Sequence, residues 1–136
     1  MSNITTNIKG IRDIMRKDTG VDGDAQRISQ MVWMLFMKIF ADKEEEWEIT
    51  IDNYESPIPE NLKWQNWAAD DEGLTGDALM EFVNNELFPA LKELDITISP
   101  QAQIIRSVFE DTYNYMKNGT LFRQVINVIN EIDFNS

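Results

Sequence analysis

The segment from Asp22 to Trp47 constrains the fold more than any other part of the chain. Its apolar side chains recur three and four residues apart, which is the spacing of one face of an α-helix. The residues of this face are Ile28, Met31, Val32, Leu35, Phe36, Ile39 and Phe40. Further apolar groups stand on the other sides, at Trp33, Met34 and Met37, so we expect other helices to enclose much of this one. The pattern predicts an all-α domain around one central buried helix.

One further helix is predicted before this central helix and another after it. A first helix is expected from Ile4 to Met15, since isoleucines recur there at helical spacing and Gly20 follows as a terminator. After the central helix, Thr75 or Asp77 can begin a helix that runs to about Leu94. Pro89 is expected to kink this helix, because proline has no N–H and clashes with the preceding turn.

Capping residues predict two further helices near the end of the chain. Ser99-Pro100 is typical of a helix start, and apolar spacing carries that helix to Met116 before Asn118-Gly119 stops it. Thr120 is then expected to cap a short final helix that buries Val125 and Ile126. The fold class predicted is therefore all-α, with about five helices and a single domain over residues 1–136.

Residues 48–76 are expected to form a long irregular connection. Apolar residues alternate briefly around Ile51, which leaves room for a short edge strand or strand pair, and Ser56-Pro57-Ile58-Pro59 favours an extended backbone. Trp64 and Trp67 are expected to cover the core like a lid. Loops of this length are unusual in compact domains and are often functional.

The composition excludes many kinds of catalytic site. The chain contains no histidine and no cysteine, which removes the usual general base, His-based triads, thiolate metal sites and cysteine nucleophiles. No glycine-rich nucleotide loop, P-loop or Asn-Pro-Pro-aromatic sequence occurs. Asp18, Asp22 and Asp24 lack the spacing of a calcium loop and are interpreted as helix caps. We therefore predict no catalytic, cofactor-binding or metal-binding residue in this chain.

Charge is distributed unevenly along the sequence. The net charge is −12, and residues 41–100 hold sixteen acidic and three basic groups, whereas residues 1–40 hold four acidic and six basic groups. The acidic stretch is interpreted as a solvated surface. Helical spacing places Lys9, Arg12 and Arg16 on one face of the first helix, and Lys17 follows them. These four residues are the candidate nucleic-acid contacts, and an ordinary solvated helix surface is the alternative.

The methionines of the central helix have a functional and a structural interpretation. Met31, Met34 and Met37 could form an adaptable binding face, but core packing is favoured because they lie in the central helix.

The longest apolar run, residues 31–37, is too short to span a bilayer, and the N-terminus lacks a signal-peptide pattern. We expect a cytoplasmic protein that does not enter a membrane.

Several polar sequence words resemble a known family. These words are Asp22-Gly23-Asp24-Ala25-Gln26-Arg27-Ile28-Ser29-Gln30, Trp33-Met34-Leu35-Phe36, Asp42-Lys43-Glu44-Glu45-Glu46-Trp47, Asn53-Tyr54-Glu55-Ser56-Pro57-Ile58-Pro59-Glu60, Asn118-Gly119-Thr120-Leu121 and Arg123-Gln124-Val125-Ile126. In this order, and over nearly the whole chain, they resemble the start of the modification subunits of type I restriction-modification systems, the HsdM family.

The resemblance implies a role that the absent motifs fit. It implies the N-terminal helical domain of an adenine-N6 DNA methyltransferase subunit, whose S-adenosylmethionine-binding catalytic domain is absent from this chain. Its implied partners are a specificity subunit, a second modification subunit, a restriction subunit and double-stranded DNA, met through the complex. The domain would help to assemble the complex and close it around DNA. The alternative is a stand-alone acidic interaction protein or DNA mimic, which the charge of residues 41–100 would suit.

Overall fold

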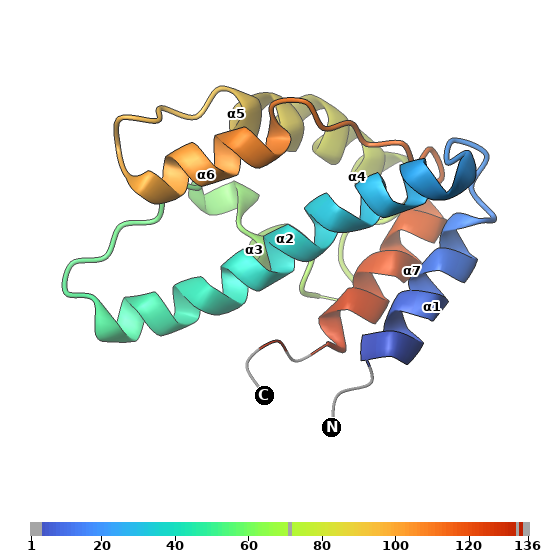
Figure 1. The fold of residues 1–136 in the computed structure, drawn as a ribbon, viewed down its shortest axis with the longest axis horizontal. Helices are drawn as coiled ribbons and strands as arrows, with labels where there is room; N and C mark the ends of the chain where they lie inside the picture. Colours follow the sequence, from blue (N-terminus) through green and yellow to red (C-terminus); the bar gives the residue numbers. More distant parts are fainter. Residues whose placement is uncertain (1–3, 71, 133, 135–136) are drawn as a thin grey trace.

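The computed structural model of the chain describes residues 4–70, 72–132 and 134, and it is built from helices (Figure 1). The α-helices are α1 (Ile4–Met15), α2 (Gly23–Thr50), α3 (Trp64–Trp67), α4 (Gly76–Phe82), α5 (Phe88–Lys92), α6 (Pro100–Phe109) and α7 (Gly119–Asn130). A 3-10 turn covers Glu60–Leu62, and a π-helical turn covers Val83–Leu87 between α4 and α5. The described residues contain no strand. The predicted all-α class is confirmed.

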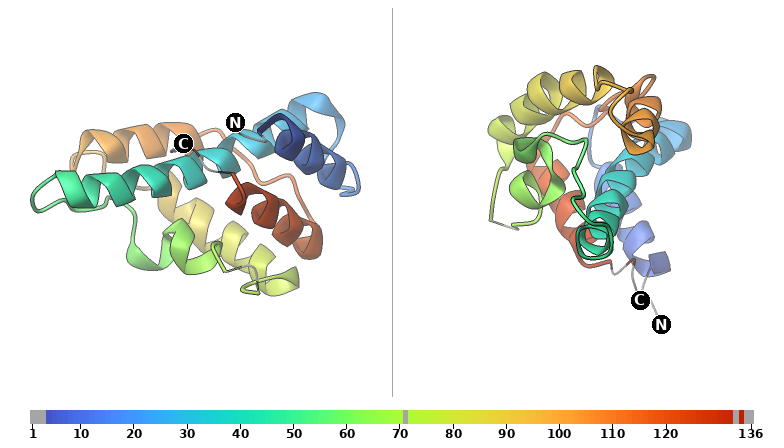
Figure 2. Two further views of the ribbon diagram at one scale, coloured as in Figure 1. Left: turned by 90° about the horizontal axis from the view of Figure 1, so that it is seen from below. Right: turned by 90° about the vertical axis from the view of Figure 1, so that its left-hand side faces the viewer.

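Helix α2 is the axis of the molecule. It has 28 residues, which at 1.5 Å per residue gives a length of about 42 Å. Figures 1 and 2 show α1 and α7 side by side near its first half, and α6 running along its second half. The segment expected to form a short strand instead contributes Ile49 to the last turn of α2, which ends at Thr50. The irregular connection therefore starts later than predicted.

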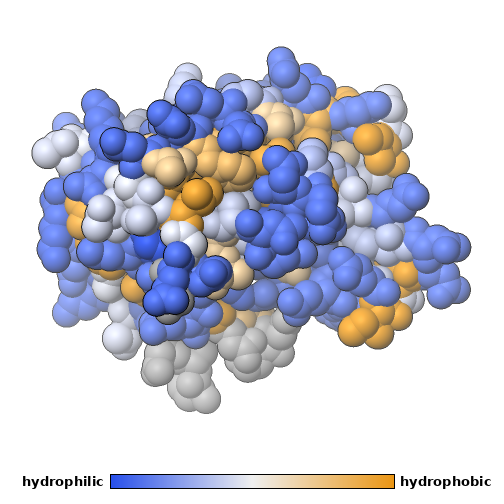
Figure 3. Space-filling model, turned by 180° about the vertical axis from the view of Figure 1, so that it is seen from behind, coloured by the Kyte–Doolittle hydropathy of each residue, from blue (hydrophilic) through white to orange (hydrophobic). Residues whose placement is uncertain are grey.

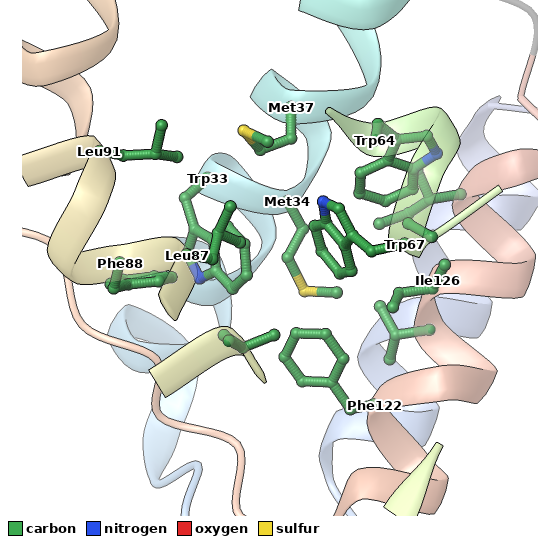
Figure 4. Close-up of a cluster of buried hydrophobic side chains, with 14 of the residues drawn as sticks. Trp33, Met34, Met37, Trp64, Trp67, Leu87, Phe88, Leu91, Phe122 and Ile126 are labelled. Carbon is green, nitrogen blue, oxygen red and sulfur yellow. The ribbon is translucent and has the colours of Figure 1, made fainter. Parts of the chain in front are cut away.

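The centre of the core is Trp33, which is completely buried. Its ring contacts three phenylalanines from different helices: Phe88 at 4.8 Å between centroids, Phe109 at 5.9 Å and Phe122 at 5.9 Å. Figure 4 shows Trp33 with Phe88, Phe122 and Met34 around it. Such aromatic pairs add to the free energy gained by burial. Helix α2 thus organises α5, α6 and α7 through one side chain.

The buried face of α2 differs from the expected one. Ile28, Val32 and Ile39 are 59%, 55% and 37% exposed. The buried face is instead formed by Gln30, Met31, Trp33, Met34, Met37, Phe40 and Glu44. The expected face was wrong for those three residues because every residue from Met31 to Met37 is apolar, so spacing alone does not select the side of α2 that meets the core. Core packing of Met31, Met34 and Met37 is confirmed.

The two tryptophans of the connection lie in the core as predicted. Trp64 and Trp67 are 3% and 4% exposed, and their rings lie 5.4 Å apart. The Trp67 indole N–H donates to the Leu62 carbonyl at 3.0 Å, and the Trp64 indole N–H donates to the Asn130 side chain at 2.7 Å. The lid is therefore fixed both by burial and by directed hydrogen bonds.

The helix predicted from Thr75 to about Leu94 is present with a local irregularity. The π-helical turn directly precedes α5, and the Phe88 N–H donates to the Val83 carbonyl five residues earlier. Pro89 stands in the first turn of α5. Since proline cannot donate to the carbonyl one turn before it, the widened turn is where the expected distortion occurs.

The end of α6 and the cap of α7 differ from their predictions. Ser99 caps α6 as expected, accepting from the Ala102 N–H at 3.2 Å, but the helix ends at Phe109 instead of Met116. Lys92 donates to the Glu110 and Thr112 carbonyls at 3.2 and 3.0 Å, which satisfies backbone beyond this end. Helix α7 is capped by Asn118, which accepts from the Leu121 N–H at 3.0 Å, instead of by Thr120.

Buried polar side chains hold the irregular segments in place. Asp18 is 2% exposed and accepts from the N–H groups of Gly20, Lys117 and Asn118 at 2.8, 3.0 and 2.9 Å. The interpretation of Asp18 as a helix cap is therefore wrong: it closes the turn after α1 and fastens that turn to the start of α7. Asp22 occupies the N-cap of α2 without a side-chain cap bond; instead its N–H donates to the Gln26 side chain at 2.8 Å.

Arg123 performs a similar task for the tryptophan lid. Its guanidinium is 5% exposed as a residue and donates to the carbonyls of Leu74, Ala68 and Trp67 at 2.7, 2.9 and 3.2 Å. The Trp67 carbonyl belongs to the last residue of α3, and those of Ala68 and Leu74 lie between α3 and α4, where no helix supplies their donors. One side chain on α7 thereby anchors the connection on both sides of residue 71.

Replacing Arg123 with methionine should destabilise the fold. The methionine fills similar space but leaves buried carbonyls without donors, and we expect the free energy of unfolding to fall by about 2 to 4 kcal/mol. Urea unfolding followed by tryptophan fluorescence measures this change. The control is Arg12→Met on exposed α1, expected to shift stability by less than about 0.5 kcal/mol. Equal losses in the two variants would contradict this role of Arg123.

Two glycine-to-alanine variants should change stability in opposite directions. A Cβ on Gly119 would overlap the backbone of Gly76, whereas a Cβ on Gly10 meets nothing within 4 Å. Gly10→Ala should stabilise the chain by about 0.5 to 1 kcal/mol through helix propensity. Gly119→Ala should lower the thermal midpoint, since two backbones must separate. Both are measured by thermal unfolding, and a stabilising Gly119→Ala would disprove the close approach.

Candidate DNA and partner surface on the first two helices

The predicted basic residues lie at the surface of α1. Lys9, Arg12, Arg16 and Lys17 are all exposed. The structure brings the first three together around a shallow depression of about 410 Å³, and Lys17, which follows the end of the helix, does not line it. Arg16 lies 3.7 Å from Asp13, with about half of each side chain exposed. An exposed pair of this kind is weak, so Arg16 remains able to meet another anion.

A groove lies beside this basic face, between α1 and α2. It has a volume of about 300 Å³, and its lining is mainly apolar. The lining residues are Ile8, Arg12, Asp24, Arg27, Ile28, Met31, Val32 and Leu35. Arg12 belongs to both the groove and the basic depression, so the two form one continuous surface.

The wall of this groove continues along α2 as an apolar stripe. We use the name α2 stripe for Ile28, Val32, Leu35 and Ile39, which lie at i, i+4, i+7 and i+11 on one side of the helix. Ile28 and Val32 are more than half exposed, although both lie in the middle of a helix. The rear of the molecule shows mostly hydrophilic side chains with apolar areas between them (Figure 3). An exposed apolar stripe is typical of a contact surface.

Charged groups at the rim of the groove are partly paired. Arg27 forms an ion pair with Asp24, and the hydrogen bond from Arg27 lowers the pKa of Asp24. The Arg27 side chain is only 15% exposed, and its Nε–H is buried without an acceptor among the described residues. Arg12 stands exposed on the other side. The rim is therefore basic over an apolar floor.

The acidic residues lie at the opposite end of α2. Glu45, Glu46, Glu48 and Asp52 are exposed where α2 ends and the following turn begins. In Figure 1 this end lies far from α1. Glu44 is buried there and accepts from the Tyr54 hydroxyl at 2.8 Å; burial, together with this hydrogen bond, raises the pKa of Tyr54. The last turns of α2 thus gather exposed carboxylates, while other exposed acidic residues of the stretch, such as Asp77 and Glu81, lie on α4.

The described residues offer no arrangement for metal chemistry. Residues 4–70, 72–132 and 134 contain no group of three or more acidic side chains placed to hold a metal ion. Within the same ranges, no helix is both long and apolar enough to cross a bilayer. What the surface of α1 and α2 can do is bind: phosphates at the arginines and apolar groups in the groove.

The sequence indicated the basic half of this surface and missed the apolar half. Helical spacing correctly placed Lys9, Arg12 and Arg16 on one face, as the depression lined by all three confirms. The α2 stripe was assigned to the core. Its one sequence signal is an excess of apolar residues, since α2 carries more of them between residues 28 and 40 than one buried face requires.

Polar substitution in the α2 stripe should leave the isolated chain stable. We expect Val32→Lys, at a side chain 55% exposed, to change the free energy of unfolding by less than about 0.5 kcal/mol. Met37→Lys, at 1% exposure on the same helix, should cost about 3 kcal/mol or more, because it buries an unpaired charge. Urea unfolding compares the two. A Val32→Lys loss as large as that of Met37→Lys would show that the stripe is packed.

Comparison with known proteins identifies the domain. Residues 4–129 match the family model of the HsdM N-terminal domain. The chain is 58% identical over 135 residues to the type I restriction enzyme EcoEI methylase subunit of Escherichia coli, and the alignment covers 98% of this chain and 28% of that protein. The chain therefore spans less than a third of this curated relative.

Two solved structures share the fold. One is a modification subunit of a putative type I restriction enzyme from Vibrio vulnificus YJ016, with a TM-score of 0.87, 33% identity, and coverage of 97% of this chain and 31% of that one. The other comes from work on complex assembly and conformational transition of the type I R-M system, with a TM-score of 0.84, 30% identity, and coverage of 97% and 26%. With a family match over nearly its whole length, the chain belongs to the HsdM N-terminal domain family.

Proposed function

We propose that this domain helps to assemble a type I restriction-modification complex and to hold it around DNA. Family membership makes the chain the N-terminal domain of a modification subunit. The observation that supports the proposed task is the surface on α1 and α2, where exposed arginines adjoin an exposed apolar groove. Such a surface suits contact with phosphates and with protein at the same time.

The chemistry of the reaction belongs, in this proposal, to a part of the subunit outside this chain. The EcoEI relative is a methylase subunit of which this chain covers 28%. The remainder would bind S-adenosylmethionine and transfer its methyl group to adenine N6 in DNA. The subunit would do this in the cytoplasm. The domain itself would contribute no reacting group. Its task is to orient the subunit on the duplex.

DNA contact would be made only by the basic end of the domain. A net charge of −12 opposes binding to DNA by the chain alone. Lys9, Arg12, Arg16 and Lys17, however, are exposed on or just after α1, and the exposed Glu45, Glu46 and Glu48 lie at the far end of α2. The domain would therefore approach phosphates with α1 foremost, and only when the specificity subunit holds it near the duplex. A second modification subunit and a restriction subunit would complete the complex.

The stand-alone DNA mimic is not favoured. It required that the acidic stretch imitate phosphates for a basic partner, but the chain is similar over 98% of its length to part of a larger methylase subunit. The exposed acidic residues are better explained as a face that stays away from DNA.

Charge reversal on α1 tests the DNA contact. In the complete complex of modification and specificity subunits, Arg16→Glu should weaken DNA binding and reduce the slope of log affinity against log salt by about one. Adding Arg12→Glu should reduce the slope further. The measurement is DNA affinity by fluorescence anisotropy at several salt concentrations.

Lys43→Glu is the matched control for this experiment. Lys43 also forms a weak ion pair three residues away, with Glu46 at 3.6 Å, and its side chain is 50% exposed against 53% for Arg16. It lies in the acidic half of α2, so its reversal should leave the salt slope unchanged. If the slopes of the Arg12 and Arg16 variants equal that of the parent complex, the proposed DNA contact through α1 is wrong.

A further inference from the structure

We propose that the α2 stripe and the adjoining groove are the seat of the polypeptide that follows residue 136 in the full-length modification subunit. The occupant would be an apolar surface of that polypeptide with acidic groups at its edge. This inference rests on the proposed function, in which the chain is the first domain of a longer subunit. It assigns the apolar half of the surface to a contact within one subunit and leaves the basic half to DNA, with Arg12, which lines both, at the border of the two contacts.

The α2 stripe is long enough and exposed enough to be a packing surface. From Ile28 to Ile39 the stripe extends over three turns of α2, or about 16 Å. Ile28, Val32 and Ile39 are 59%, 55% and 37% exposed, and the groove beside them is a depression of about 300 Å³. Side chains at i, i+4, i+7 and i+11 form the ridge that helices use to pack against one another. A surface of this form fits a helix or another apolar face better than it fits DNA.

The described part of the chain ends close to α2. The Lys38 Nζ lies 6.0 Å from the centre of the Phe134 ring. Lys38 is fixed on α2 next to Ile39, with its Nζ 2.7 Å from both carboxylate oxygens of Asp42. The ring of the last described residue thus lies near the Lys38 side chain of α2, whose neighbour in sequence, Ile39, is the last residue of the stripe.

The relatives contain enough further polypeptide to cover the stripe and groove. This chain covers 28% of the EcoEI methylase subunit, 31% of the Vibrio vulnificus modification subunit and 26% of the other solved chain. Most of each relative is therefore a polypeptide beyond this domain. A segment tethered next to an exposed apolar stripe is present at a high effective concentration, so it occupies the stripe ahead of a separate molecule.

The charge at the rim specifies the edge of the occupant. Arg12 is exposed beside the apolar floor, and Arg27 has a buried Nε–H without an acceptor among the described residues. Asp24 neutralises only one of these two guanidinium groups directly. An occupant with a carboxylate near Arg12 would complete the rim, which is why we assign acidic groups to its edge.

Photo-cross-linking in the full-length modification subunit tests the assignment. A photoreactive side chain replaces Val32 in one preparation and Ile104 of α6 in a matched control, since the two are 55% and 54% exposed. The isolated subunit is irradiated while dilute, and cross-linked peptides are identified by mass spectrometry. We expect the Val32 probe to join peptides from beyond residue 136 within the same chain, with a yield about tenfold above that of the Ile104 probe.

Three results would overturn the proposal. They are cross-links from position 32 only to a second modification subunit, cross-links only to an added specificity subunit, and yields equal to those at position 104. A repeat with the probe at Ile28, which is 59% exposed, guards against a local failure at one position, and circular dichroism checks that each variant folds. The proposed DNA contact is judged separately by the salt slope of the Arg16 variant, so either idea can fail alone.

Discussion

The packing of three phenylalanines around Trp33 is the interaction on which the rest of the fold depends. These rings come from α5, α6 and α7, helices of five, ten and twelve residues, which are too short to be stable alone in water. The Trp33 indole N–H has no hydrogen-bond acceptor among the residues that the structure describes. The Phe88 ring stands perpendicular to the indole at 4.8 Å, and Figure 4 shows the indole nitrogen on that side. A contact of the N–H with the aromatic ring offsets part of the cost of burying it.

A second set of interactions holds the segments that have no regular structure. Residues 110–118 cross the molecule without a helix, and their backbone is paired by side chains from other elements. Gln30, itself fully buried in α2, accepts from the Tyr115 N–H at 2.7 Å and donates to Asn114 at 2.8 Å. Asp18 pairs the next residues, and Arg123 does the same for the tryptophan lid. Several polar words that carried the family resemblance thus contain the groups that satisfy buried backbone.

The sequence predicted the helices better than it predicted their faces and ends. Local signals, such as Ser99-Pro100 at the start of α6, placed helix starts because capping is decided by neighbouring residues. The end of α6 was misplaced because Lys92, eighteen residues before Glu110, supplies the donors there. The buried side of α2 was misassigned because Gln30 and Glu44, both buried and polar, interrupt the face that meets the core. The basic residues of the candidate surface needed only helical spacing, whereas the groove depends on where α1 lies against α2.

The unbroken length of α2 gives the domain the mechanical character of a rod. No proline or glycine interrupts the helix after Gly23, so its two halves cannot turn independently without breaking backbone hydrogen bonds. Because about 20 to 35 Å of helix separate the groove from the glutamate-rich end, a tilt of about five degrees at the groove displaces that end by about 2 to 3 Å. A small rearrangement at the groove therefore produces a larger displacement at the far end of α2. There, repulsion between like charges would oppose an approach to any neighbouring acidic surface.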